Sequence, residues 1–264
     1  MRWWWLALLA LWPAAGTAGG KRPVLPSIAD KAFIEECVRG HNDCRAKVAP
    51  AASNMRYMTW DAALARTARA WANKCRFQHN THLKNKYQCH PNFTSIGENI
   101  WLGSHQMFTV VGAIGAWYNE VRFYTFETRK CTKVCGHYTQ VVWDHSYKVG
   151  CAVAFCKKVG GINNAALFVC NYAPGGNFPR RPYTKGASCS KCAKEDTCEN
   201  KLCSKFVFIC LFLGYPRWNP PWEFRIVCDE ACIAVAVLRP SVMFLAFISA
   251  YFIKKHFVNM HMST

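Results

Sequence analysis

The chain has 264 residues, which is enough for one domain with additional segments at its ends. Hydrophobic residues make up 52% of it and charged residues 18%, a composition that builds a hydrophobic core and excludes a largely disordered chain. The chain has sixteen cysteines, which argue against a reduced cytosolic compartment. Its 33 Lys and Arg residues against 15 Asp and Glu give a net charge of +18, which favours acidic partners such as sulfated glycans, anionic lipid or nucleic acid.

Residues 1–18 have the pattern of a secretory signal peptide. One positive charge, Arg2, precedes an apolar run from Trp3 to Trp12, and small residues follow up to Ala18, where we expect cleavage. The run is shorter than the roughly 20 apolar residues that a membrane-spanning helix needs. Secretion accounts for the cysteines, which pair in an oxidising lumen, and argues against nucleic acid as a partner.

The central part of the chain is predicted to have an α+β fold. Apolar residues at helical spacing predict three helices: one after Asp30, which caps it, one after Asp61 and one over residues 109–121. The period then changes to two, which predicts strands over 149–155 and 166–172, separated by a glycine-containing turn. Helices first and strands later indicate helices that cover a small sheet.

Cysteine spacing divides the chain between its two ends. Nine scattered cysteines lie from Cys37 to Cys170, an odd number, so at least one must pair outside this region or stay a thiol. We place the main domain at residues 30–180, because a turn-rich basic segment ends it, and a cysteine-rich hinge and juxtamembrane segment at 186–232. The tight cluster in the hinge suits a zinc knuckle or a pair of disulfides, and the secretory pathway favours disulfides. Its members are Cys189, Cys192, Cys198 and Cys203.

Residues 233–253 form a 21-residue apolar segment, long enough to cross a membrane as a transmembrane helix. Arg239 and Pro240 interrupt it, but a central Arg costs roughly 2.5–3.5 kcal/mol on insertion scales, which the apolar residues outweigh. The basic residues that follow predict a short cytoplasmic tail, 254–264, and a single-pass membrane protein with its N-terminus outside. The alternatives are a GPI signal, in which the apolar tail would finish the chain, and a buried soluble helix, since the uninterrupted part, 241–253, has only thirteen residues.

Four motifs occur in order within the main domain. They are His41-Asn42-Asp43-Cys44-Arg45, Gly97-Glu98-Asn99-Ile100, Gly136-His137-Tyr138-Thr139-Gln140-Val141-Val142-Trp143 and Leu167-Phe168-Val169-Cys170-Asn171-Tyr172-Ala173-Pro174-Gly175-Gly176. Together they resemble the signatures of the CAP superfamily, which comprises cysteine-rich secretory proteins, antigen 5 and pathogenesis-related-1 proteins. The signature residues are His41, Asn42, Arg45, Gly97, Asn99, Trp143, Cys170, Asn171 and Tyr172. The hinge and the apolar C-terminus make the chain most similar to the glioma pathogenesis-related group, and to a membrane-anchored member of it.

The resemblance implies a three-layer α-β-α sandwich with a central cleft lined by two histidines and two acidic residues. Carried over by motif, these are His79, Glu98, Glu120 and His137. Imidazole nitrogen and carboxylate oxygen are both zinc ligands, so the cleft is predicted to bind zinc or another divalent cation, with the histidines as first ligands and the glutamates acting directly or by orienting the rings. Binding requires neutral imidazole and weakens below about pH 6.5. The alternative is a hydrogen-bonded polar cleft that only holds the helices to the sheet.

The predicted function is that of an extracellular recognition module and not of an enzyme. The chain lacks H-E-x-x-H and G-x-S-x-G, no residue is identifiable as a nucleophile, and Cys135 is expected to be in a disulfide. The resemblance implies a role in reproduction or innate defence, with a cell-surface protein, a glycan, or a lipid or sterol as partner. The alternatives are a sterol or lipid carrier, for which aromatic residues such as Trp101 and Phe108 would line a groove, and a metal-dependent hydrolase. Asn92-Phe93-Thr94 is a sequon for N-glycosylation of Asn92.

Overall fold

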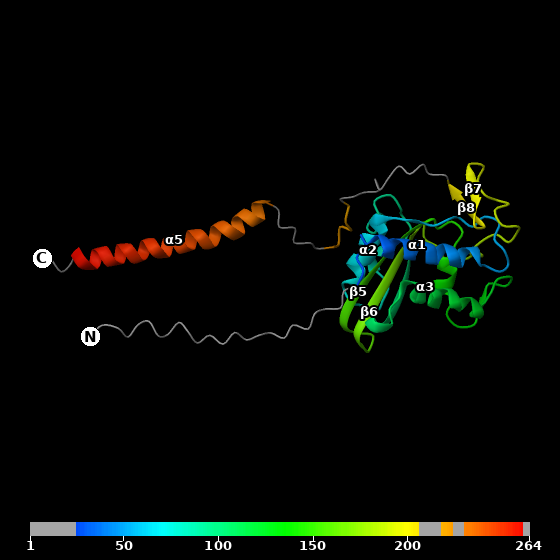
Figure 1. Ribbon diagram of the computed structural model, residues 1–264, viewed down its shortest axis with the longest axis horizontal. Coiled ribbons are helices and arrows are strands. Elements are labelled where there is room, and N and C mark those ends of the chain that lie inside the picture. The colour runs from blue at the N-terminus through cyan, green and yellow to red at the C-terminus, as the bar shows by residue number, and fades with distance from the viewer. Residues whose placement is uncertain (1–24, 206–217, 224–229, 261–264) are drawn as a thin grey trace. The chain divides into compact units, whose positions relative to one another are not determined.

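The computed structural model describes residues 25–205, 218–223 and 230–260, with side chains at 238–256 in the last range. The chain divides into two compact units, residues 1–221 and 222–264, and each is described by itself. Figure 1 shows helices packed on a sheet in the first unit. The predicted signal peptide lies outside the described residues and stays a prediction.

A four-stranded sheet forms the centre of the first unit, in the order β1-β5-β6-β2. The strands are β1 (Thr59–Trp60), β2 (Gly97–Ser104), β5 (Lys148–Val159) and β6 (Ile162–Ala173). β1 runs parallel to β5, and the other neighbours are antiparallel. The β5–β6 hairpin confirms the two predicted strands and their glycine turn, in which Gly160 and Gly161 both have positive φ. β2, at the edge of this sheet, was not predicted from the sequence patterns.

The predicted helices are present. They are α1 (Lys31–Ala46), α2 (Ala62–Ala72) and α3 (Val110–Tyr118), and a short α4 (Gly136–Val141) follows. The carboxylates of Asp30 and Asp61 accept hydrogen bonds from first-turn amides of α1 and α2, which is why these helices begin there. The third helix ends at Tyr118 and not at Val121, because the chain tightens into a 3-10 turn, η3 (Asn119–Phe123).

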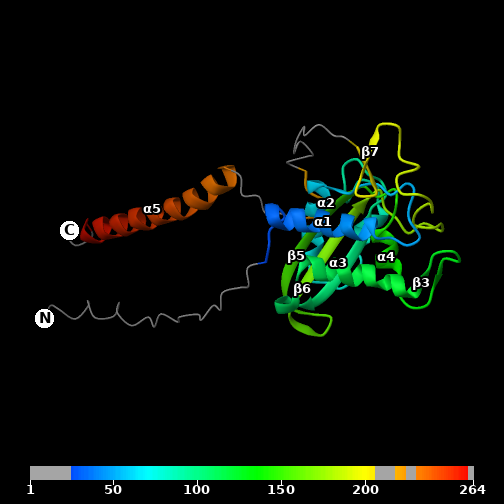
Figure 2. The same ribbon diagram turned by 45° about the vertical axis from the view of Figure 1, so that its right-hand side comes forward.

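The helices lie on both faces of the sheet and make three layers. α2 packs so closely on β5 that a Cβ atom on Gly150 would overlap the backbone of Ala65, so this crossing requires glycine. On the other face, α1 and α3 lie side by side, as Figures 1 and 2 show. The hydrophobic core fills the space between these two helices and the sheet, where Phe33 of α1 and Ile114 of α3 join Phe168 of β6.

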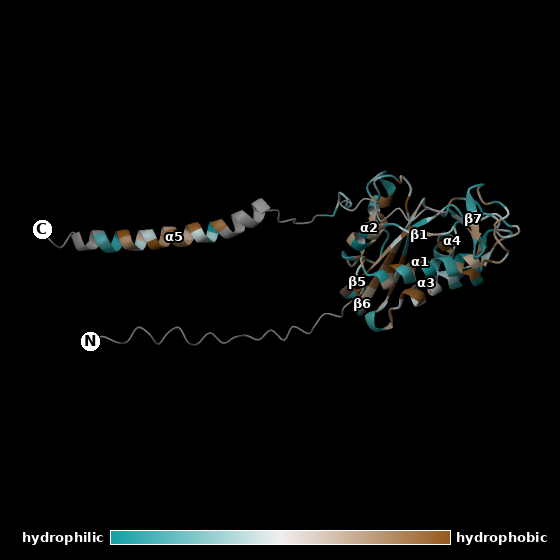
Figure 3. Cartoon of the chain, turned by 45° about the horizontal axis from the view of Figure 1, so that its top comes forward, coloured by the Kyte–Doolittle hydropathy of each residue, from teal (hydrophilic) through white to brown (hydrophobic). Residues whose placement is uncertain are grey.

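The remaining elements are short. They are η1 (Thr81–Lys84), η2 (His105–Met107), β3 (Tyr124–Thr125), β4 (Lys130–Cys131), β7 (Asp196–Glu199) and β8 (Leu202–Lys205). β3 pairs with β4, and β7 pairs with β8. Figure 3 shows that β5 and β6 are largely apolar, as buried strands are, whereas β7 is hydrophilic.

Five disulfides cross-link the described residues. They are Cys75–Cys156, Cys131–Cys135, Cys151–Cys170, Cys189–Cys198 and Cys192–Cys203. The last two use all four cysteines of the hinge cluster, which confirms disulfides and leaves no thiolate there for a zinc knuckle. Cys135 is bonded as predicted, and Cys37 and Cys44 of α1 remain thiols.

The cysteine-rich hinge is attached to the main domain by backbone pairing. The amide of Cys203 in β8 donates to the carbonyl of Met55 at 2.7 Å, and the amide of Tyr57 donates to the carbonyl of Cys203 at 2.8 Å. The β7–β8 hairpin is therefore part of the folded domain and is not a separate linker.

In the second unit, α5 (Glu230–Met260) contains Pro240 and covers the predicted membrane span, 233–253. No helix among the described residues is long and apolar enough to cross a membrane. The helix that we predicted is present, but its role as a transmembrane helix is not supported.

Candidate functional site

Arg45, in the first motif, holds the scaffold together. Its fully buried guanidinium donates hydrogen bonds to the carbonyl oxygens of Arg56, Val141, Trp143 and Ser146, at 2.7 to 3.0 Å. Burial lowers its pKa to about 9, so the group still carries its charge at neutral pH. One side chain thus joins the segment after α1 to the segment between α4 and β5.

His41 is also a core residue. Its Nδ1 donates to the carbonyl of Cys37 at 2.7 Å, and its Nε2 accepts a hydrogen bond from the Tyr172 hydroxyl at 2.8 Å. The Asn99 amide donates to the same hydroxyl at 3.2 Å, so residues of three motifs form one buried chain. Burial lowers the pKa of His41 to about 4. The neutral ring has both nitrogens engaged and offers none to a metal.

Asn42 and Cys170 are structural as well. The Asn42 side-chain nitrogen donates to the Met58 carbonyl at 2.9 Å, and its side-chain oxygen accepts from the Met58 backbone amide at 2.8 Å. These are the two hydrogen bonds that the backbone of a neighbouring strand would make. Cys170 of β6 is bonded to Cys151 of β5 inside the core. These signature residues therefore build the domain and leave its chemistry to other side chains.

Gly97 and Trp143 fix the loops around the end of β2. A Cβ atom on Gly97 would overlap the side-chain oxygen of Gln140, which accepts a hydrogen bond from the amide of Gly176 at 2.9 Å. Trp143 is buried, and the guanidinium carbon of Arg180 lies 4.2 Å from the centre of its ring. The absence of a side chain at residue 97 is thus a packing requirement.

Glu98, at the start of β2, holds His79. Its carboxylate accepts hydrogen bonds from Nδ1 of His79 and from the amide of Asn80, both at 2.9 Å, and from the side chain of Asn171 at 3.4 Å. The Glu98 side chain is 1% exposed and the His79 ring 66% exposed. The hydrogen bond with Glu98 raises the pKa of His79. The sequence patterns missed Asn80 and Asn171 as partners, since the pairing of β2 with β6 sets Glu98 opposite Asn171.

Glu120, on η3, holds His137 in the same way. Its carboxylate accepts from Nδ1 of His137 at 2.6 Å and from the backbone amides of His137 and Tyr138 at 3.0 and 3.2 Å, which satisfies the first turn of α4. The His137 side chain is 29% exposed, and the Trp117 ring stacks on it with centroids 6.3 Å apart. In this pair too, the glutamate engages Nδ1 and leaves Nε2 for a ligand.

The four predicted ligands form two pairs, His79–Glu98 (the first pair) and Glu120–His137 (the second pair). Glu98 and Gly150 lie in the same row of paired residues across the sheet, so their side-chain positions are on the same face. This is the face on which α2 packs. The next residue, Asn99, points to the other face, where its amide donates to the His137 carbonyl at 3.0 Å. Within the described ranges, no three His, Cys, Asp or Glu side chains are placed to hold a metal ion. The four residues predicted to line one cleft are thus arranged as two hydrogen-bonded histidine–glutamate pairs.

The two pairs nevertheless have donor chemistry that suits a cation. A histidine that binds a metal commonly donates its other ring N–H to a carboxylate, which fixes the tautomer and the ring orientation. Both pairs have this arrangement at Nδ1. The raised pKa of His79 means that protons compete for its ring at a higher pH than for an ordinary histidine.

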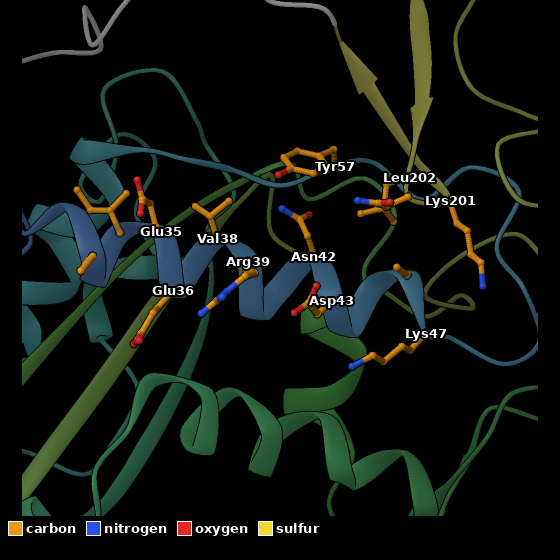
Figure 4. A pocket seen from close by; sticks show the side chains of 14 residues that line it. Glu35, Glu36, Val38, Arg39, Asn42, Asp43, Lys47, Tyr57, Lys201 and Leu202 are labelled. Carbon is orange, nitrogen blue, oxygen red and sulfur yellow. The ribbon is translucent and has the colours of Figure 1, made fainter.

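A large hollow of about 1020 Å³ lies elsewhere, along the outer face of α1 (Figure 4). Tyr57 and Leu202 border it from the side of the hinge hairpin. Most of the labelled α1 side chains are charged, namely Glu35, Glu36, Arg39 and Asp43, and Lys47 follows directly after the helix. Val38, Tyr57 and Leu202 add apolar surface, so the groove combines charged and apolar groups. The aromatic residues predicted for a lipid groove, such as Trp101 and Phe108, pack against the core instead.

Comparison with known proteins agrees with this geometry. Residues 38–172 match the profile of the cysteine-rich secretory protein family, CAP. The chain belongs to the CAP family. It is 50% identical to GLIPR1-like protein 1 of Bos taurus over 217 residues, which cover 82% of this chain and 89% of the relative. It is 55% identical to Glioma pathogenesis-related protein 1 of Mus musculus over 179 residues, which cover 68% of this chain and 67% of the relative. This CAP domain is thus of the glioma pathogenesis-related group, as predicted.

Solved structures confirm the CAP fold. The chain is 29% identical to Na-ASP-1, with a TM-score of 0.55, over 69% of this chain and 51% of that one. It is 26% identical to a structure described as NaASP2 with Zn2+, with a TM-score of 0.52, over 69% of this chain and all of that one. The sandwich of α2, sheet and α1–α3 is therefore the family's architecture.

Proposed function

We propose that this CAP domain is an extracellular recognition module that binds a divalent cation, zinc before others, at His79 and His137. The observation that carries the proposal is the bond from Nδ1 of each ring to a glutamate, at 2.9 and 2.6 Å, which presents both Nε2 atoms to a ligand. The similar structure described as holding Zn2+ supports the choice of metal. The bound cation would supply positive charge that attracts an acidic group of a partner.

The domain is proposed to bind and not to catalyse. Catalysis by a nucleophile needs a hydroxyl or thiol beside a base. The cysteine nearest in sequence to His137 is Cys135, which forms a disulfide with Cys131 and so offers no thiol. The groove on α1, which charged and apolar side chains line together, gives the module a second surface.

Calorimetric titration of the full chain with zinc tests the metal proposal. We expect binding in the wild type and its loss or reduction in His79→Ala and in His137→Ala. The matched control is His145→Ala. His145 is also an exposed histidine with Nδ1 bonded to a carboxylate, that of Asp144 at 2.7 Å, but the guanidinium of Arg180 lies 3.2 Å from that nitrogen and repels a cation.

The stoichiometry then distinguishes one shared site from two. If both rings bind a single ion, either substitution abolishes binding; if each pair binds its own ion, each substitution removes about half of the sites. Absence of zinc binding in the wild type, or an equal loss in His145→Ala, would contradict the proposal.

We also propose that Asn92 carries an N-linked glycan. Asn92 and Thr94 are both exposed in the segment that precedes β2, as the modification requires. Removal of N-glycans from the secreted protein should lower its mass, and Asn92→Gln should abolish that change. A mass that glycosidase leaves unaltered in the wild type would refute it.

A further inference from the structure

Two long runs of the chain contain no acidic residue. Residues 62–97 hold six Lys or Arg and no Asp or Glu, and residues 145–194 hold eight Lys or Arg and no Asp or Glu. Much of the net charge of +18 is concentrated in these runs. Where they meet in the fold, neither run supplies a carboxylate to neutralise the surface.

The disulfide Cys75–Cys156 joins the two runs. It connects the chain just after α2 to β5, with Cα atoms 5.7 Å apart. Lys74 and Arg76 flank the first cysteine, and both are exposed. Lys158 is two residues beyond Cys156 in the same strand, so it leaves β5 on the face of the disulfide, and it is exposed as well. Three cationic side chains are therefore gathered around one rigid cross-link.

Two neighbours extend this surface. Phe77 is 56% exposed, and its Cβ lies 3.9 Å from the place where a Cβ of Gly160 would stand, so it rests against the tip of the β5–β6 hairpin. His82 of η1 lies near Lys74, whose charge lowers its pKa after the larger effect of burial. The same short turn contains the exposed Lys84. We call this surface the basic edge; its members are Lys74, Arg76, Phe77, Lys84 and Lys158.

Two basic residues elsewhere on the domain form close ion pairs. Arg180 lies 2.6 Å from a carboxylate oxygen of Asp144, and Lys185 lies 2.8 Å from that of Glu127. By contrast, no carboxylate of the described residues comes within 4.0 Å of the charged groups of Arg76 and Lys158. Arg76 and Lys158 thus keep their charge available for an external anion.

We propose that the basic edge binds a sulfated polysaccharide. Sulfate groups repeated along a chain complement ammonium and guanidinium groups, and the planar fork of Arg76 suits a tetrahedral anion. The exposed ring of Phe77 provides a flat apolar surface on which a sugar ring packs. A lipid bilayer is held by several apolar side chains that enter its interface, whereas here one ring stands among the cations. This binding goes beyond the cation site and does not depend on it.

The test is binding of the full chain to heparin-type sulfated polysaccharide, to the same polysaccharide after desulfation, and to phosphatidylserine vesicles, over a range of salt concentrations. The variant is Arg76→Gln/Lys158→Gln. Its matched control, Arg122→Gln/Lys130→Gln, also removes one exposed Arg and one exposed Lys, but from η3 and β4. All four positions are exposed, and unchanged circular dichroism shows that both variants fold.

We expect the wild type to bind the sulfated chain and not the desulfated one. The variant should lose affinity at least tenfold, and the slope of log affinity against log salt should fall by about two, one for each charge removed. The control should keep both values. An equal loss in the control, equal binding after desulfation, or binding to vesicles without binding to polysaccharide would overturn the proposal.

Discussion

His41 and His79 belong to the same family pattern, yet they lie in opposite environments. His41 is 0% exposed, has both ring nitrogens bonded in the core, and has a pKa lowered to about 4 by burial. The His79 side chain is 66% exposed, has one nitrogen bonded to Glu98, and has a raised pKa. That a histidine belongs to a family motif therefore does not tell whether it is structural or part of the candidate site. Its burial and the number of its ring nitrogens that are hydrogen-bonded do.

The largest effect is expected on the scaffold side, at Arg45. Arg45→Met should lower the free energy of unfolding by roughly 3–5 kcal/mol, because it leaves several buried carbonyl groups without a donor. Denaturant unfolding of the secreted chain measures it. Arg45→Lys should recover little, since one ammonium lacks the fork that reaches four carbonyls. A loss below about 1 kcal/mol would show that the network is not needed.

His41 should make stability depend on pH. The unfolded state takes up the proton near pH 6.5 and the folded state near pH 4, so the stability is present above pH 6.5 and is lost, by roughly 3 kcal/mol, as the pH falls to 4. Denaturant unfolding at pH 7 and at pH 4 should show this loss in the wild type and a smaller one in His41→Gln. An equal loss of stability in the wild type and in His41→Gln would mean that His41 is not the group responsible for the pH dependence.

Gly97 should show a moderate effect. Gly97→Ala introduces a Cβ that displaces Gln140 and its hydrogen bond to Gly176, so the free energy of unfolding should fall by about 1–3 kcal/mol. Gly115→Ala is the matched control, because a Cβ there meets no atom within 4 Å. Equal stability of the two variants would refute this account of the β2 end.

Glu98 should affect the site with little effect on the scaffold. Glu98→Gln removes the charge that raises the pKa of His79, so that pKa should fall toward about 6.5 in an NMR titration of the ring. The stabilisation from protonated His79 is present below pH 6.5 and lost as the pH rises through its folded pKa, and the variant should lack it. Glu120→Gln is the control and should leave the pKa of His79 unchanged; a change there would indicate that the pairs are coupled.

Local signals predicted much of the fold. Asp30 caps α1, and the change of period predicted β5 and β6. β2 was missed because its first residues, Gly97 to Asn99, are polar or lack a side chain and serve contacts that only the assembled sheet creates. Strand order depends on contacts between residues far apart in the chain, which periodicity does not report.

The site was predicted in its residues but not in its arrangement. The resemblance supplied His79, Glu98, Glu120 and His137, but the hydrogen bonds that pair each histidine with one glutamate, and the contact of Asn99 with the His137 carbonyl, follow from contacts that only the folded domain creates. The register of β2 against β6, which sets Glu98 opposite Asn171, is likewise not visible in the sequence.

The most direct test of the metal proposal is the ¹⁵N shift of each histidine ring nitrogen as zinc is added. Zinc should move the Nε2 resonances of His79 and His137 while their Nδ1 atoms stay protonated, and it should leave both nitrogens of His41 unmoved. Unmoved Nε2 resonances in His79 and His137, or a response confined to other histidines, would contradict it.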